Sequence, residues 1–596
     1  MKKYINKIGI SIGAIFIMAS CTELDLAPLD AANSQNWYNT DEQFRLSLNE
    51  GYRPAFYPLD GDDGGSNKGW DDDVAYRNIF SEIRSGTVNS EFYIAQNSWT
   101  NVYKGITRML IVLDKIEKDN GVLTVTQKNQ YEGEAKFLLG TYWSYLIAHF
   151  GDVPFYDKSI SVDESFTIPR TDKALILQKI YEYFDFAANN LPKNYIGNAN
   201  GLEYATKGAA LAFKARIALY MSDYSTATMA AKLCMELNAY TLHSNFEELF
   251  LSKTKQSSEI IFKIPRSTAF LQTVNATEIT NIIPRSNGGF GSVAPSWQLL
   301  ASFECVDGLP IDQSPLFDPR NPFKNRDPRL LATIVPFGSF KTGDGRTSDM
   351  GSRHIDKEFN SHPVHTRILN YLTNNLETNL DTKSNQNFCS WNGLLWKKGV
   401  DSDWGDKQAD NDLILMRYAD VLLMYAEAKM ELNEIDNSVL SAINTVRTRA
   451  YANSAFATPL VTTTDQAKLR YIIRNERRSE FALERLRYMD LIRWKLADVI
   501  MDGGENYGLA QITANASPNV VQADSQLMLK VVNPGNWFWG MTPQLDENGV
   551  ADFKPLANAG LCQLLATSSF PERQYLWPIP ASERRLNTNL TQNDDY

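Results

Sequence analysis

Apolar residues recur every three or four positions over long stretches of this chain, which is the pattern of amphipathic helices. Phe137, Tyr142, Tyr145 and Leu146 mark one such helix from about residue 131 to 150. Glycine and proline in the following turn, residues 151–154, should end that helix. The same reasoning predicts further helices at about 172–191, at 206–220, after Asp223, and at about 413–431, 437–450 and 465–500.

Most of these helices follow one another in pairs with short turns. Alanines at helical spacing, such as Ala209, Ala210, Ala227 and Ala230, would let neighbouring helices approach closely. Helix pairs of this kind stack into a tetratricopeptide-like (TPR-like) superhelix. Between about residues 257 and 412 the periodicity is poor, although a strand-like run occurs at 259–264. We therefore predict a mainly α fold, a helical superhelix with TPR-like pairs and an irregular, loop-rich, ligand-facing insertion with short strands.

The N-terminus has the organisation of a secretory signal. Basic residues at positions 2, 3 and 7 precede an apolar run at 8–18 and the small pair Ala19-Ser20. The apolar run is too short to span a hydrocarbon core of roughly 30 Å. Cys21 then completes a Met-Ala-Ser-Cys sequence that resembles a bacterial lipobox, whose cysteine is diacylated and becomes the new N-terminus. The alternative is an ordinary signal peptide with a chance cysteine nearby.

These boundaries predict three parts. They are a signal peptide at 1–20, a lipid-anchored tether at 21–34 and one folded domain at 35–596. Within that domain we expect a TPR-like half up to about 256, the loop-rich insertion at about 257–412 and a helical part at 413–596.

Composition narrows the classes of function. The 43% apolar and 11% aromatic content is enough to bury a large core. The net charge is −11 and no basic block occurs, which argues against a nucleic-acid ligand. The four cysteines after Cys21 have no zinc-site spacing, so we expect mostly free, buried thiols.

Several motifs follow one another along the chain. They are the block at 133–138 with 149–154, Asn-Arg-Asp-Pro-Arg-Leu at 325–330, Arg-Tyr-Ala-Asp-Val-Leu-Leu at 417–423 with Tyr-Ala-Glu-Ala at 425–428, Ile-Asn-Thr-Val-Arg at 443–447, 476–481 with 487–494, and 575–580 with 591–593. Together these motifs resemble the SusD/RagB family of nutrient-binding outer-membrane lipoproteins, over nearly the whole chain.

The resemblance implies a specific role. Proteins of this family sit on the outer face of the outer membrane and cap a SusC-type, TonB-dependent transporter. They pass it a ligand, usually an oligosaccharide, and have no catalytic activity and no organic cofactor. Two alternatives remain: the same scaffold with a peptide or other nutrient as cargo, or a surface glycoside hydrolase.

Three glutamates raise the hydrolase alternative. Glu476, Glu480 and Glu484 are spaced to share one helix face, and glycosidases use paired carboxylates. Five arginines interleave with them between positions 477 and 493, however, and arginine neighbours lower carboxyl pKa values. We therefore predict a structural ion-pair network and no enzyme activity. Asp420 and Glu427 are expected to pair with Arg447 or Arg449 in the same network.

Sugar recognition needs exposed aromatic faces beside polar side chains, so loop residues are the candidates. The alternative for each is a buried anchor of its loop. The loop at 60–73 also resembles a calcium site superficially, although its twelfth position is Asp71 and not glutamate. No other metal site is predicted. The predicted ligand-binding residues are Trp70, Asp72, Asp73, Tyr76, Trp297, Trp391 and Trp404.

Overall fold

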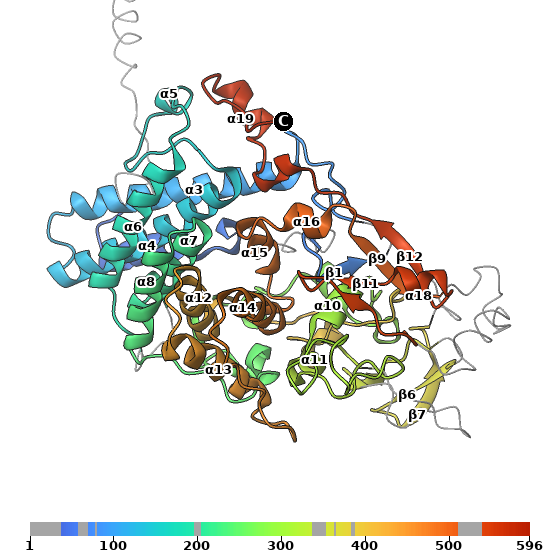
Figure 1. Ribbon diagram of the computed structural model, residues 1–596. Coiled ribbons are helices and arrows are strands. Elements are labelled where there is room, and N and C mark those ends of the chain that lie inside the picture. Colours follow the sequence, from blue (N-terminus) through green and yellow to red (C-terminus); the bar gives the residue numbers. More distant parts are fainter. Residues whose placement is uncertain are drawn as a thin grey trace, which may run out of the picture.

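The computed structural model describes residues 37–57, 69–77, 80–195, 204–336, 353–362, 365–382, 388–510 and 539–596. Long helices dominate it (Figure 1). They are α2 (Asp41–Asn49), α3 (Tyr93–Glu117), α4 (Val125–Phe150), α6 (Lys173–Asn190), α7 (Lys207–Tyr220), α8 (Tyr224–Glu236), α12 (Tyr418–Glu431), α13 (Asn437–Tyr451) and α14 (Gln466–Phe481). The predicted mainly α fold is confirmed.

Local sequence explains where these helices begin and end. Thr124 caps α4 and forms a reciprocal capping box with Gln127, so the helix begins earlier than its apolar pattern suggested. Thr206 and Asp223 accept backbone N–H bonds at the starts of α7 and α8. Gly151 follows α4 with a φ of 73°, a conformation that favours glycine.

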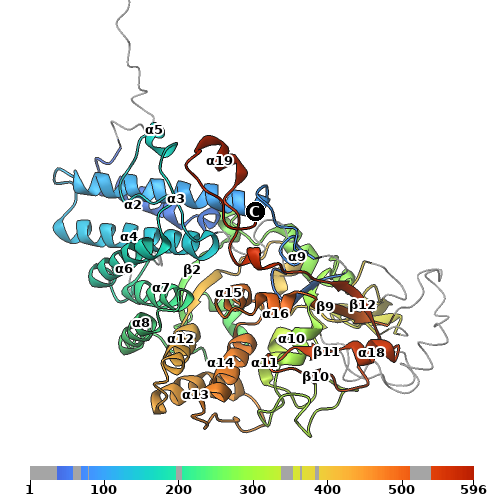
Figure 2. The ribbon, with the colours of Figure 1, turned by 45° about the horizontal axis from the view of Figure 1, so that its top comes forward.

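Successive helices stack side by side. Each of α3, α4, α6, α7 and α8 packs on the next, and α12 continues the stack against α8 and carries α13 and α14 (Figure 2). The small residues allow this close approach: Ala209, Ala210 and Ala227 are fully buried. A Cβ atom on Gly140 would lie only 2.8 Å from the ring of Phe184, so this position requires glycine.

Two predicted helices differ in the structure. Residues 413–417 are not helical but form strand β8 (Leu413–Arg417), which pairs with β2 (Ile260–Ile264). The segment 465–500 forms not one helix but α14, α15 (Arg487–Arg493) and α16 (Ala497–Met501). Leu483 and Arg485 lie between α14 and α15 with positive φ values, which interrupts the helix.

Short elements make up the remainder, much of which lies in the yellow, green and red region of Figure 1. The short helices are α5 (Val162–Ser165), α9 (Ala276–Ile282), α10 (Trp297–Ser302), α11 (Pro328–Thr333), α18 (Lys554–Asn558) and α19 (Ala581–Leu586). Antiparallel pairs are β1 (Val74–Tyr76) with β3 (Val293–Pro295), β9 (Glu505–Leu509) with β12 (Cys562–Thr567), and β10 (Gln544–Leu545) with β11 (Ala551–Asp552). A four-stranded sheet has the order β4 (Arg353–His354), β5 (Lys357–Glu358), β6 (Arg367–Asn370), β7 (Asn375–Thr378).

A buried ion-pair network joins these parts, as the sequence predicted. The Glu480 carboxylate accepts from Arg417 Nη1 at 2.6 Å and Arg329 Nη1 at 3.0 Å, and Arg449 is a third partner. Burial by itself would raise the pKa of Glu480, but these three guanidinium groups lower it well below its usual range. Glu476 likewise pairs with Arg329. The Glu480 carboxylate therefore remains ionised and makes a poor general acid.

The predicted partners of Asp420 and Glu427 were wrong. Asp420 pairs with Arg216 at 2.6 Å and Arg477 at 2.8 Å, and Glu427 pairs with Arg493 at 2.5 Å. The reason is tertiary: α12 packs between α7 and α14, so its acidic side chains meet arginines from these neighbours and from α15.

The Asp420 pair predicts a loss of stability in acid. Burial by itself would raise the pKa of Asp420, but Arg216 and Arg477 lower it to about 2. A carboxyl group whose pKa is lower in the folded state stabilises the fold above its unfolded pKa and loses that contribution as pH falls. We expect the urea midpoint to decrease between about pH 4 and pH 2. Asp420→Asn should show a smaller decrease, and an identical decrease in both proteins would contradict this assignment.

The other sequence expectations concern cysteines and membrane spans. Cys234, Cys305, Cys389 and Cys562 are all free and buried, which confirms that prediction. Within the described ranges, no helix is long and apolar enough to cross a membrane.

Candidate functional site

A cleft of about 430 Å³ opens where four separate segments meet. We call it the polar cleft. The segments are the turn after α2, the chain just before β1, the first turns of α3, and the loop that leads from β2 into α9 together with the start of α9. Its lining residues are Pro54, Ala55, Tyr57, Trp70, Ile94, Asn97, Ser98, Asn101, Arg266, Gln272, Thr273, Asn275 and Glu278.

Helix α3 supplies amide groups to one wall. Asn97 and Asn101 lie one turn apart, and Asn101 Nδ2 donates to Asn97 Oδ1 at 3.1 Å. Both side chains are half-buried and both line the cleft. Each amide keeps further donor and acceptor capacity, because an asparagine side chain has two N–H donors and two oxygen lone pairs. This wall therefore presents fixed groups of both kinds.

The β2–α9 loop forms the opposite wall and is held by backbone contacts. Arg266 N–H donates to Asp412 at 2.9 Å, and Ser267 and Gln272 form a short antiparallel bridge. The tip of this hairpin carries Phe270 and Leu271, which are 80% and 85% exposed. An apolar tip this exposed beside a cleft is typical of a binding surface.

The charges at the cleft are few and partly neutralised. Glu278 is buried and pairs with Arg485 at 3.2 Å. Arg266 is half-buried and donates to the carbonyl of Asn411 at 3.4 Å. Most of the polar side chains that line the cleft are thus uncharged, and the buried rings of Tyr57 and Trp70 also line it. The indole N–H of Trp70 is buried without a hydrogen-bond partner among the described residues. This arrangement suits a neutral ligand with many hydroxyl groups.

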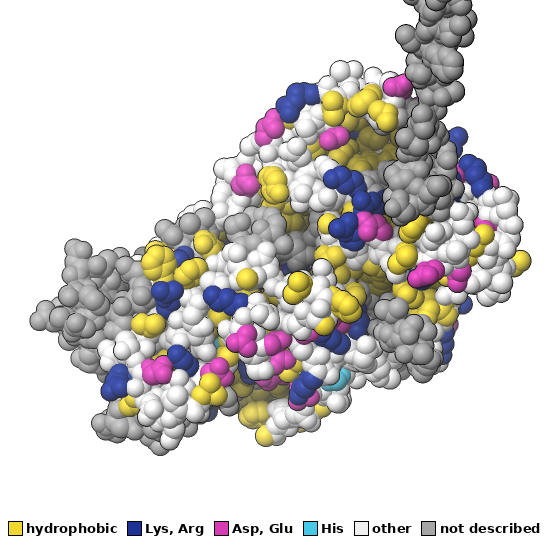
Figure 3. All heavy atoms as spheres, turned by 180° about the vertical axis from the view of Figure 1, so that it is seen from behind, with side chains coloured by type: hydrophobic (Ala, Val, Ile, Leu, Met, Phe, Trp, Pro, Cys, Tyr) yellow, Lys and Arg dark blue, Asp and Glu magenta, His cyan; other side chains and the backbone are white. Residues whose placement is uncertain are grey.

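The distribution of charge on the outer surface is consistent with an uncharged ligand. On the face in Figure 3, basic and acidic side chains are interspersed. No extended basic surface is visible there, so that face does not resemble a binding surface for the phosphate backbone of a nucleic acid.

Of the sequence-predicted residues, Trp70 alone lines the polar cleft, and it is not exposed. It is 4% exposed and packs edge-on against Tyr488 and Trp577 at centroid distances of 5.5 and 5.3 Å. Asp72 and Asp73 are also buried, and they bind Arg478 at 2.7 and 2.8 Å. The expected exposure of these three residues was wrong, because the loop end that carries them packs into the core.

The other predicted residues lie apart from the cleft. Trp297 is buried and its indole N–H donates to the carbonyl of Asn392 at 2.8 Å. Trp404 is buried too and donates to Asn411 at 2.8 Å. Both are anchors of their loops, and their expected exposure was wrong. Tyr76 and Trp391 are half-buried, and ligand contact by them stays a prediction.

Sequence reasoning missed most of the cleft. A signal existed for Asn97 and Asn101, since asparagine is disfavoured inside helices and these two lie four residues apart. No local signal marks Arg266, Gln272 or Glu278. The calcium hypothesis falls mainly on residues 58–68, which lie outside the described residues. Within the described ranges, no group of three or more metal-binding side chains occurs.

Two protein-family models match most of this chain. A family model described as the SusD family matches residues 258–596. A second, described as starch-binding associating with outer membrane, matches residues 69–219. SusD-like protein P25 of Formosa agariphila is 27% identical over 446 residues, which span 74% of this chain and 77% of that protein.

Solved structures show the same fold. A SusD-like carbohydrate-binding protein from Bacteroides fragilis is 25% identical, with a TM-score of 0.70 and coverage of 93% of this chain and 99% of that one. A laminarin-binding SusD-like protein has a TM-score of 0.60 at 17% identity, covering 94% and 100%. The family model spans more than half of the chain and the fold agrees, so this protein belongs to the SusD family.

Proposed function

We propose that this protein captures an oligosaccharide in the polar cleft and delivers it to a SusC-like TonB-dependent transporter. The observation that carries the proposal is the chemistry of the cleft. Asn97, Asn101 and Gln272 offer amide donors and acceptors, and Arg266 adds a cation. Sugar hydroxyls both donate and accept hydrogen bonds, so a mixed set of neutral partners matches them. The volume of about 430 Å³ lies within the usual range for small-ligand sites.

Aromatic side chains around the cleft extend the match. Tyr93 begins α3 and is 63% exposed, and Phe270 is at the tip of the opposite hairpin. Neither ring lines the cleft itself, but each is close along the chain to a residue that does, so we propose that both cover the apolar faces of sugar rings at the cleft entrance. Carbohydrate binding by the B. fragilis relative supports the same ligand class for this chain.

The N-terminal sequence and the family support a location in the cell. We infer that Cys21 is lipidated and that the domain sits on the outer face of the outer membrane. The family model that matches residues 69–219 carries the words associating with outer membrane, which supports this location. Two or more acyl chains would give stable anchoring. The transporter supplies the pore, and this protein supplies affinity for the ligand.

Two alternatives compete with this function. A peptide or other nutrient could bind to the same scaffold, although the cleft has few charged side chains that could pair with the charged termini of a peptide. A hydrolase would need two accessible carboxylates, and Glu476 and Glu480 are instead buried against arginines. A structural calcium ion near residues 60–71 would be compatible with either role.

Asn97→Ala with Asn101→Ala should weaken oligosaccharide binding by about 1–3 kcal/mol, because two fixed amides are lost from one wall. The measurement is calorimetric titration of the protein from residue 22 onward against a panel of polysaccharides and their oligomers. Gln96→Ala is the matched control, since Gln96 lies on the same helix but does not line the cleft. We expect both variants to keep their thermal unfolding midpoint within a few degrees of the parent protein.

The outcomes separate the alternatives. Unchanged affinity in the double variant would move the ligand away from the polar cleft. Shortening of the glycan during titration would indicate a hydrolase, and binding of peptides but no glycan would indicate the other cargo. Co-purification with the partner transporter from detergent-solubilised membranes tests delivery, and a Cys21→Ala variant recovered in the soluble fraction would support the anchor.

A further inference from the structure

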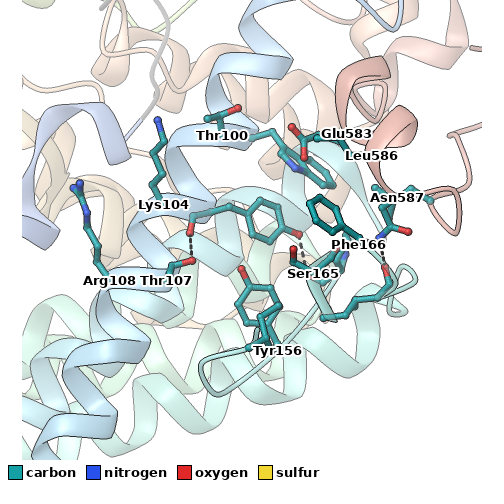
Figure 4. Close-up of a pocket in the computed structure, with 16 residues that line it drawn as sticks. Thr100, Lys104, Thr107, Arg108, Tyr156, Ser165, Phe166, Glu583, Leu586 and Asn587 are labelled. Atoms are coloured by element: carbon teal, nitrogen blue, oxygen red, sulfur yellow. Dashed lines mark hydrogen bonds between the residues drawn. The ribbon is translucent and has the colours of Figure 1, made fainter. Parts of the chain in front are cut away.

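A second pocket of about 420 Å³ lies between α3, the α4–α6 connection and α19, and shares no lining residue with the polar cleft. We call it the α3–α19 pocket (Figure 4). Figure 4 shows Glu583 and Leu586 of α19, with Asn587 just after it, at one end and Lys104 and Arg108 of α3 at the other. Trp99, Tyr103, Tyr156 and Phe166 give the pocket four aromatic lining residues.

The pocket is held together by contacts between distant segments. The Tyr103 hydroxyl donates to the carbonyl of Pro154 at 2.8 Å, and its ring lies 4.9 Å from that of Trp99 and 6.2 Å from that of Tyr156. Asn587 Nδ2 donates to the carbonyl of Ile168 at 2.8 Å, which ties α19 to the chain after α5. The aromatic wall is therefore preformed.

Glu583 also lines this pocket, and the contacts that hold the pocket together do not involve its carboxylate. Its side chain is half-buried, and its carboxylate makes no hydrogen bond or ion pair with any described residue. Burial raises the pKa of the Glu583 carboxyl group, and no cation among the described residues offsets that effect. A half-buried carboxylate is stabilised by a cationic partner, and the neighbouring aromatic rings also attract cations. A cationic ligand could supply this partner.

The other charged groups at the pocket do not fill this role. Lys104 is exposed at the mouth, where solvent screens its charge. Arg108 pairs with Glu50, outside the pocket. On α19, Arg584 donates to the carbonyl of Leu590 and Arg585 pairs with Glu91. Glu583 thus remains the charge that faces the aromatic lining.

We propose that the α3–α19 pocket binds a ring-shaped ligand that carries a protonated amine, such as an amino sugar with a free amino group. Glu583 would accept from the ammonium group, and the faces of Tyr156 and Phe166 would attract its charge and pack on the ring. Phe166 is 42% exposed, so its ring is accessible to a ligand. The inference is independent of the proposed function, because it uses a different site and requires a positively charged ligand.

Calorimetric titration with D-glucosamine, at a pH below the pKa of its amine, tests the proposal directly. N-acetyl-D-glucosamine and D-glucose are the matched probes, since they keep the ring but lack the charge. We expect D-glucosamine to bind at least about fivefold more tightly than either probe. Equal binding of the three sugars, or no binding of D-glucosamine, would overturn the proposal.

Variants assign the binding to this pocket. Glu583→Gln keeps the side-chain shape and should weaken D-glucosamine binding by about tenfold. Phe166→Ala should also weaken it, whereas Lys104→Met should leave it unchanged or strengthen it, because it removes a like charge. Asn101→Ala in the polar cleft should have no effect. A loss of binding in Asn101→Ala with none in Glu583→Gln would place the amine in the polar cleft and overturn the proposal.

Discussion

Replacing Glu480 with glutamine is expected to lower the free energy of unfolding by about 3–5 kcal/mol. Glu480 is fully buried, and its carboxylate balances Arg329, Arg417 and Arg449 at the centre of the network. The substitution keeps the size of the side chain but removes the negative charge, so three buried guanidinium groups lose part of their compensation. Urea denaturation followed by circular dichroism measures the effect as a shift in the midpoint.

Glu91→Gln is the matched control for this experiment. Glu91 also pairs with an arginine, Arg585 at 3.2 Å, but the two side chains are 62% and 66% exposed. Exposed pairs of this kind contribute about 0–1 kcal/mol, so the midpoint should barely move. A similar shift in the two variants would contradict the view that burial makes Glu480 critical. Enzyme activity that disappears in Glu480→Gln while stability is unchanged would revive the hydrolase alternative.

Trp70→Ala is expected to destabilise the protein by about 3–5 kcal/mol, because it removes a large buried ring and leaves a cavity. Trp70 packs edge-on against Tyr488 and Trp577, and Trp577 in turn contacts Phe92 and Phe150. The cavity would therefore open where the N-terminal helices meet the C-terminal segment. Thermal and urea denaturation of the variant measure this effect.

This expectation differs from the one drawn from sequence, in which Trp70 was an exposed sugar platform. A platform residue could be removed with a loss of affinity and no loss of stability. Trp70→Phe is the matched variant: it retains most of the packing and should cost less than half as much as Trp70→Ala. If Trp70→Ala unfolds at the parent midpoint while glycan affinity decreases, the buried position is wrong and the sequence interpretation holds.

Short-range features of the fold were readable from sequence. Helix starts at Thr206 and Asp223 depend on a side chain that bonds backbone groups two or three residues away. The end of α4 depends on one glycine. The division of 465–500 into three helices was not readable, because the residues that break it, Leu483 and Arg485, have no intrinsic preference for positive φ.

The sequence by itself determined the mainly α class, the starts of several helices, the family and the structural nature of the glutamates near Arg477. Tertiary structure decided which acid meets which arginine, because Asp420 finds Arg216 only when α12 packs beside α7. It also decided which aromatic rings are exposed: Trp70, in a glycine-rich loop, is buried, whereas Phe270 is exposed at a hairpin tip. Exposure and charge pairing depend on contacts between segments far apart in the sequence, whereas helix capping and apolar periodicity act within a few residues of the same chain.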